Sequence, residues 1–188
     1  MSKITRRNFI KTSALSAIFL SSVPQAVKSM ASPFWDDYDE VICKKKFKLL
    51  IDGDVKSMSI GDAIGEVGKS FIDTDYVAGT LDKNMSESLV VNLTGLDCVT
   101  FVENCLVFAR CIKQVKTSFD DYKAELKKVR YRDGKIDGYS SRLHYFCDWI
   151  TNNEDKGIVK IITADIGGVS YNKNIDFMST HTKSYKQL

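Results

Sequence analysis

The stretch that decides the fold is GLDCVTFVENCLVFARCIKQ, residues 95–114. From Val99 to Ile112 its apolar residues cover most of the circumference of a helix, rather than one stripe of it. A helix that is apolar nearly all round has to be buried on most of its sides. We therefore predict a buried helix over residues 97–114, with Asp97 as its N-cap.

Cys98 directly follows this N-cap and so falls in the first turn of the predicted helix. Unpaired backbone N–H groups and the positive end of the helix dipole stabilise a thiolate at such a position. A thiolate there is a ready nucleophile, and the N–H of Cys98 can point at a developing oxyanion. A cysteine that only packs can occupy the same position, so local chemistry leaves both interpretations open.

Further elements are predicted from periodicity, N-caps and turn residues on both sides of this helix. Ser59 caps one of the predicted helices. The predicted helices cover residues 33–50, 59–71, 119–129 and 140–150, and the predicted strands cover residues 89–93 and 157–163. Residues 52–54 are predicted to form a turn and 73–79 a loop, while 167–188 show no strong period. The chain contains no internal repeat or low-complexity segment.

Residues 1–31 have the order of parts found in a twin-arginine signal peptide. Arg6 and Arg7 lie in a basic segment, residues 14–23 are apolar but too short to span a bilayer, and Ser29-Met30-Ala31 supplies small residues for cleavage. We expect export to the periplasm or beyond, and a single domain over residues 32–188. The alternative is a basic, apolar helix that stays attached.

The charge balance argues against nucleic acid as a partner. Five of the 27 basic residues and none of the 24 acidic residues lie in residues 1–31, which leaves residues 32–188 with a net charge of −2. A basic face that would attract nucleic acid or an anionic membrane is therefore not expected. We expect a monomer without a stable membrane anchor.

The cysteine pattern argues against a metal site. No CxxC pair occurs among the five cysteines, and no two histidines stand at ligand spacing, so neither a metal nor a cofactor is predicted. Most of the cysteines are expected to be small core residues. A thiol redox protein is a weaker alternative, because Cys105 lies seven residues from Cys98, about 10 Å along a helix and too far for a disulfide.

Several separate blocks resemble one family of bacterial cell-wall enzymes. They are DYVAGT (75–80), LVVNL (89–93), GLDCVTFV (95–102), RYRDG (130–134) and GYSSRLHYF (138–146). Together they are similar to the NlpC-like cysteine peptidases and amidases, and most closely to their branch of N-acetylmuramoyl-L-alanine amidases, which cut the lactyl amide between muramic acid and the stem peptide. The resemblance implies a papain-like α+β fold and peptidoglycan fragments (muropeptides) as substrate.

The resemblance also implies roles for individual residues. Cys98 matches the family's nucleophile, and Tyr76 matches the tyrosine whose hydroxyl helps to bind the oxyanion. From the residues themselves, Arg142 and His144 are candidate substrate contacts, Arg142 for a carboxylate, and a structural role for His144 in an aromatic helix stays open. Val99-Thr100 stands where many relatives have Ser-Gly. The serine is associated with holding a free peptide N-terminus, so its loss suits an amidase, whose substrate nitrogen is acylated.

A histidine base is the part of the family pattern that this sequence lacks. The family presents it on a strand after the nucleophile helix, whereas His144 and His181 both fall in blocks before that segment. We therefore expect a helix-rich, incomplete domain without its downstream sheet, and little or no activity. The alternative from another class is a non-catalytic murein-binding module. His181 is expected to be structural, and Glu103 and Arg110 to be solvated or paired.

Overall fold

The computed structural model describes residues 33–184 except 172 and 175, so the predicted signal peptide lies outside the described residues. The chain divides into two units, and the boundary after Tyr38 falls within the first described helix. The second unit, from Asp39 onward, contains every other described helix and strand.

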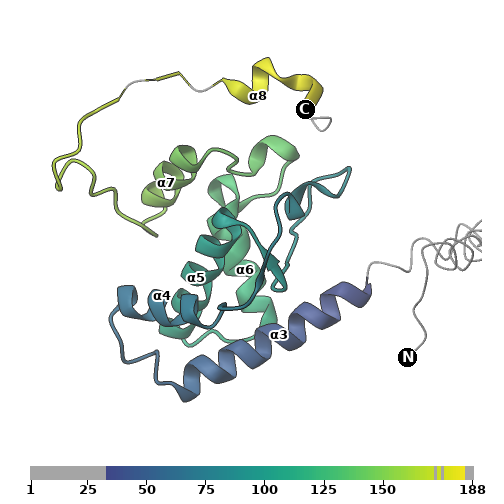
Figure 1. The fold of residues 1–188 in the computed structure, drawn as a ribbon, viewed down its shortest axis with the longest axis vertical. Coiled ribbons are helices and arrows are strands. Elements are labelled where there is room, and N and C mark those ends of the chain that lie inside the picture. Colours follow the sequence, from purple (N-terminus) through teal and green to yellow (C-terminus); the bar gives the residue numbers. More distant parts are fainter. Residues whose placement is uncertain (1–32, 172, 175, 185–188) are drawn as a thin grey trace, which may run out of the picture. The chain divides into compact units, whose positions relative to one another are not determined.

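The described residues are mostly helical (Figure 1). Their α-helices are α3 (Pro33–Asp52), α4 (Ile60–Lys69), α5 (Cys98–Lys113), α6 (Phe119–Arg130), α7 (Phe146–Asp155) and α8 (Phe177–Thr180). Short 3-10 helices cover Thr80–Asp82, Arg132–Gly134, Tyr139–Ser141 and Thr182–Ser184. Two strands, β1 (Asp75–Tyr76) and β2 (Gly95–Leu96), form one parallel pair. None of these described helices has both the length and the apolarity that a membrane span requires.

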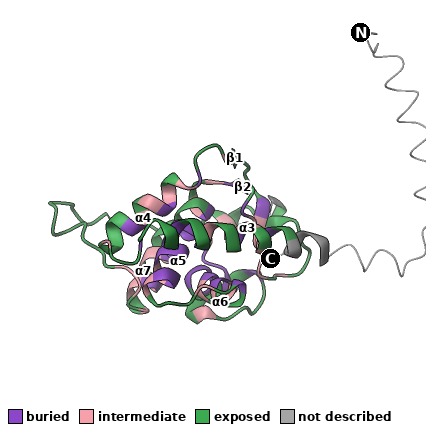
Figure 2. Cartoon of the chain, turned by 90° about the horizontal axis from the view of Figure 1, so that it is seen from below, coloured by how far each residue is buried: buried purple, intermediate pink, exposed green. Residues whose placement is uncertain are grey.

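Helix α5 is the central element, as its sequence predicts. It packs against α4 and α6, and Figure 2 shows most of it buried. Phe108 is fully buried, with its ring centroid 4.9 Å from those of both Phe47 and Tyr122. Burial is incomplete near its beginning, where Cys98 is exposed and Phe101 and Val102 are 39% and 38% exposed.

The predicted helix beginnings are confirmed where a local cap defines them. The Oγ of Ser59 accepts a hydrogen bond from the N–H of Asp62 at 3.1 Å and caps α4. Ser118 and Asp121 form a capping box at the start of α6. Such caps satisfy N–H groups that have no partner within the helix. Because they are formed by residues close together in the sequence, they can be predicted without knowledge of the fold.

The predicted strand over residues 89–93 is wrong. Its backbone groups bond to side chains from distant helices instead of to a neighbouring strand: the N–H of Leu93 donates to Asp39 at 2.8 Å, and Arg130 donates to the carbonyl of Val90 at 2.5 Å. The parallel pair lies instead at residues 75–76 and 95–96, the first of which falls in a predicted loop.

Two further predictions are corrected. The helix expected over residues 140–150 begins only at Phe146, because Arg142 forms an antiparallel bridge with Tyr131. No strand forms over residues 157–163. The N–H groups of Ile158 and Val159 both donate hydrogen bonds to the carbonyl of Asn153. A short apolar segment without a neighbouring strand cannot form the hydrogen-bond ladder of a sheet.

A buried ion pair joins α5 to the end of α6. Glu103 was expected to be solvated or paired, and the structure shows it paired and 2% exposed. Its Oε2 lies 2.9 Å from Nε and 2.8 Å from Nη2 of Arg130, whose side chain is 3% exposed. Arg110 is also paired, with Glu125 at 2.5 Å. The pair of Glu103 and Arg130 therefore ties two core helices together.

Candidate active site

The beginning of α5 is closed by a reciprocal cap that leaves the backbone of Cys98 available. Oδ1 of Asp97 accepts the N–H of Thr100 at 2.8 Å, and Oγ1 of Thr100 accepts the N–H of Asp97 at 2.9 Å. The N–H groups of Cys98 and Val99 are among those that helix geometry leaves without an intrahelical acceptor. These N–H groups form the positive end of the helix dipole, where a developing negative charge is stabilised.

The strand pair places Tyr76 beside the residues that lead into this helix. Tyr76 is in register with Leu96, and the N–H of Val77 donates to the carbonyl of Leu96 at 3.0 Å. The approach is possible because residue 95 is glycine: a Cβ there would lie 2.7 Å from Cγ2 of Val77. The two strands thus fix Tyr76 next to the segment that ends in Cys98.

Replacing Gly95 with alanine is expected to push β1 away from β2 and to lower the free energy of unfolding by about 1–3 kcal/mol, as overpacking does. Urea denaturation followed by circular dichroism measures the change. Gly65→Ala in α4 is the matched control, because no atom lies within 4 Å of its added Cβ, and it should leave stability unchanged or raise it. Equal stability of the two variants would contradict the close approach of the strands.

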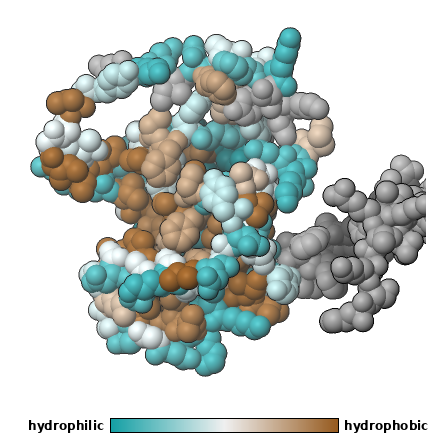
Figure 3. Space-filling model, in the orientation of Figure 1, coloured by the Kyte–Doolittle hydropathy of each residue, from teal (hydrophilic) through white to brown (hydrophobic). Residues whose placement is uncertain are grey.

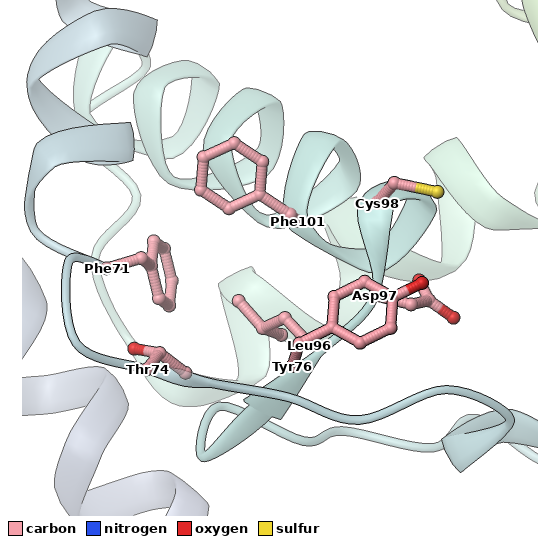
Figure 4. A pocket seen from close by; sticks show the side chains of 7 residues that line it. All are labelled: Phe71, Thr74, Tyr76, Leu96, Asp97, Cys98 and Phe101. Carbon is pink, nitrogen blue, oxygen red and sulfur yellow. The ribbon is translucent and has the colours of Figure 1, made fainter.

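The predicted nucleophile and the predicted oxyanion tyrosine line one pocket. The cavity has a volume of about 320 Å³, and its lining consists of Phe71, Thr74, Tyr76, Leu96, Asp97, Cys98 and Phe101. In Figure 4, Cys98 lies at one end, with its sulfur directed away from the aromatic rings of Phe71 and Phe101. Tyr76 is 73% exposed.

The thiols fall into two groups. Cys43, Cys105 and Cys111 are buried, as predicted for core residues, and burial raises their pKa values to about 12, 11 and 12. They stay protonated at neutral pH. Cys98 and Cys147 are exposed, and both lie in the first turn of a helix. Only Cys98 lies in the pocket.

Arg142 lies outside this pocket and is paired within the chain. Its side chain is 8% exposed, forms an ion pair with Asp82, and has its Nε 3.2 Å from a carboxylate oxygen of Glu87. Two carboxylates therefore already occupy the guanidinium that was expected to meet a substrate carboxylate. The two acidic residues are 60 and 55 positions away in the sequence, and nothing in their local pattern indicates this contact.

Neither histidine lines the pocket. Nε2–H of His144 donates to the carbonyl of Tyr139 at 2.8 Å, its ring lies 4.1 Å from the Tyr139 ring, and burial lowers its pKa. His181 is exposed; its Nδ1 lies 2.9 Å from the carbonyl of Phe177, and its ring stacks on that residue. Both histidines thus make local contacts, and neither is among the residues that line the pocket.

Three features of the site were missed by sequence reasoning. Thr100 completes the cap, and its Asp-x-x-Thr spacing from Asp97 is a signal that could have found it. Phe71 and Phe101 form the apolar part of the pocket, although each reads only as a helix core position. Lys46 lies 3.5 Å from the Phe71 ring centroid and donates to the carbonyl of Ser70 at 2.7 Å, and burial lowers its pKa to about 8.

The described residues contain no group of three or more His, Cys, Asp or Glu side chains placed to hold a metal ion. The pocket around Cys98 has Asp97 as its only carboxylate, and the cap already engages that group.

The chain is similar to several solved structures. A Bacteroides fragilis protein named as a candidate xylanase is 44% identical, with a TM-score of 0.59, over 63% of this chain and 52% of its own. An N-acetylmuramoyl-L-alanine amidase from Bacteroides uniformis is 40% identical, with a TM-score of 0.64, over 69% of this chain and 54% of its own. A Legionella pneumophila protein of family DUF1460 is 26% identical, with a TM-score of 0.57, over 69% of this chain and 42% of its own.

The chain thus spans about half the length of the Bacteroides proteins that it matches. No curated protein matches it. The AmiA-like family, described as N-acetylmuramoyl-L-alanine amidase-like, matches residues 66–188, a range that includes β1, β2, α5 and every residue lining the pocket. On this evidence the chain belongs to the AmiA-like, N-acetylmuramoyl-L-alanine amidase-like family.

Proposed function

We propose that Cys98 is the nucleophile of a cysteine amidase of NlpC-type, papain-like ancestry, and that its substrate is the lactyl amide bond between N-acetylmuramic acid and L-alanine in peptidoglycan fragments. One observation carries the proposal. In a chain of this family, an exposed cysteine at the beginning of a buried helix shares a pocket with an exposed tyrosine.

The reaction would proceed by acyl transfer. The Cys98 thiolate attacks the carbonyl carbon of the lactyl amide, and the backbone N–H of Cys98 and the hydroxyl of Tyr76 bind the resulting oxyanion. The C–N bond then breaks, the alanine nitrogen leaves with a proton, and a thioester to Cys98 remains. Water hydrolyses the thioester and regenerates the thiol.

The proton transfers in this reaction require a general base and a general acid. Among the described residues, neither histidine lines the pocket to serve as one. We therefore propose that the chain supplies the nucleophile and the oxyanion contacts, and that it turns over amide substrates poorly by itself. The same observation favours a second candidate, a murein-binding module that holds muropeptides without cleaving them.

A glycoside hydrolase is less compatible with the site. Most enzymes of that class need two carboxyl groups on opposite sides of the scissile bond. Asp97 is the only carboxylate among the residues that line this pocket, and it accepts hydrogen bonds from Thr100. The xylanase named for the Bacteroides fragilis protein is therefore not the activity that we propose for this pocket.

An activated ester separates the two candidates. An aryl ester of N-acetylmuramic acid, formed on its lactyl carboxyl group, has a leaving group that needs no proton, so Cys98 can be acylated even without a histidine. We expect a mass increase of one N-acetylmuramoyl group on Cys98. The intact chain is treated with the ester and then digested, and mass spectrometry of the peptides locates the group. The thioester forms as the ester C–O bond breaks and phenolate leaves.

Cys147 is the matched control, since it is also an exposed cysteine in the first turn of a helix. Cys98→Ala should remove the acylation, and Cys147→Ala should retain it. An N-acetylmuramoyl-L-alanyl peptide should slow the reaction at Cys98 only. Protection by the peptide without acylation would support the binding module instead, and equal acylation of both cysteines would refute a dedicated site.

A further inference from the structure

Two cavities of this protein share one side chain. The first is the pocket of about 320 Å³ that contains Cys98. The second has a volume of about 530 Å³ and lies along α4 and α5, with Gly65, Gly68, Val102, Leu106 and Trp149 in its wall. Phe101 lines both cavities. Figure 3 shows apolar side chains, in brown, gathered on the face of the molecule that α4 and α5 form.

Phe101 lies three residues after Cys98 on α5, and both residues line the first pocket, with the Cys98 sulfur directed away from the Phe101 ring (Figure 4). On one side its ring meets that of Phe71 edge-on, with 6.3 Å between the ring centroids. On the other side it lies against a glycine of α4, because a Cβ added to Gly68 would be 3.5 Å from Cζ of Phe101. The ring thus fills the space between Phe71 and α4.

We infer that Phe101 is a specificity-determining residue, which ends the pocket beside Cys98 and so limits the length of the apolar group that a substrate can place there. The inference rests on the proposed function, since it takes Cys98 as the reacting atom. The substrate class that fits is an amide with a short, uncharged side chain next to the scissile bond.

The charges around the pocket support an uncharged group. Asp97 is the only acidic or basic side chain among the residues lining either cavity, and its carboxylate accepts the N–H and the hydroxyl of Thr100, both at 2.8 Å. Outside the lining, Lys46 lies over the Phe71 ring and donates to the carbonyl of Ser70. An ammonium or carboxylate placed deep in the pocket would therefore lose water without gaining an unoccupied partner from the lining.

Removal of the Phe101 ring should join the two cavities. A long apolar group attached to a reagent at Cys98 could then extend over Gly68 towards Val102 and Leu106, along a path that the Phe101 ring occupies in the unaltered chain. Burying about 50–60 Å² of additional apolar surface corresponds to roughly tenfold tighter binding. The effect should be confined to long reagents, because a small one needs only the first pocket.

Chloroacetamide and its N-(4-phenylbenzyl) derivative are suitable probes, since they carry the same reactive group and require no general base from the protein. The measured quantity is the ratio of alkylation rates, long reagent over short, at Cys98 of the intact chain. Phe101→Ala should raise this ratio roughly tenfold over the wild-type value. Phe101→Leu, which keeps the core apolar, should raise it by a smaller factor. The same ratio at Cys147 should not change.

Val102→Ala is the matched control, because Val102 is exposed to the same degree as Phe101 but lines only the second cavity. An unchanged ratio in both Phe101 variants, with circular dichroism showing a folded chain, would overturn the inference. An equal increase in Val102→Ala would overturn it as well. Failure of the proposed function is distinguishable, because it appears as absent acylation by the muramoyl ester, whatever the alkylation ratio is.

Discussion

Replacing Glu103 with leucine is expected to lower the free energy of unfolding by about 3–5 kcal/mol, a large part of the stability of a domain of this size. The substitution leaves the guanidinium of Arg130 buried, 3% exposed, without the carboxylate that it contacts at 2.8 and 2.9 Å. An uncompensated buried charge costs far more than the pair itself contributes. Urea denaturation followed by circular dichroism measures the loss.

Two further variants separate the buried charge from a general loss of packing. Asp148→Asn breaks an ion pair with Arg132 whose side chains are 36% and 47% exposed, and it should cost at most about 1 kcal/mol. The double variant Glu103→Leu/Arg130→Met removes both charges and should recover part of the loss. A loss below about 1 kcal/mol in Glu103→Leu alone would show that Arg130 reaches water or another partner.

This ion pair also matters for the site, because Arg130 holds the segment that leads into β2. Besides Glu103, its guanidinium contacts the carbonyl of Val90. The neighbouring Tyr131 donates its hydroxyl to Glu87 at 2.6 Å and to the carbonyl of Ser88 at 2.9 Å. The backbone that carries Gly95 and Cys98 is thus positioned by polar side chains from the end of α6. We expect destabilisation at Arg130 to disturb the pocket as well.

The parts of the fold that the sequence predicts correctly are those defined by local signals. Helical periodicity and the cap at Asp97 locate α5 within one or two residues, and with it the position of Cys98 in the first turn. The same holds for α4, which begins after Ser59. The pairing of Tyr76 with Cys98 in one pocket came from the family resemblance, and the strand register supplies its physical cause.

The wrong strand over residues 157–163 has a local cause, because Ile158 and Val159 bond back to Asn153. The other wrong strand concerns residues whose partners lie far away in the sequence. The apolar stretch 89–93 has the composition of a strand, but Asp39 and Arg130 bond its backbone, and neither contact has a local signal. Arg142 illustrates the same limit, since only the folded chain brings Asp82 and Glu87 to it. The twin-arginine signal peptide over residues 1–31, with export to the periplasm, stays a prediction.

The purified chain is expected to release stem peptide from a muropeptide about 10²–10⁴ times more slowly than the Bacteroides uniformis amidase that it resembles. That range is the usual contribution of general acid–base catalysis, and it applies here because the departing alanine nitrogen must gain a proton. His144 donates to the carbonyl of Tyr139, and His181 lies against Phe177, so neither offers that proton at Cys98. Chromatography of the released peptide measures the rate.

Three substitutions and added imidazole test whether the slow rate is due to the lack of a general base beside Cys98. His144→Ala and His181→Ala should leave the slow rate unchanged, whereas Cys98→Ala should remove what remains of it. Added imidazole should accelerate the wild-type chain but not Cys98→Ala, because a small base can enter an exposed pocket and take the place of a side chain. Turnover close to that of the Bacteroides uniformis enzyme, lost on His144→Ala, would contradict this account: His144 would then have to leave Tyr139 and act as the base itself.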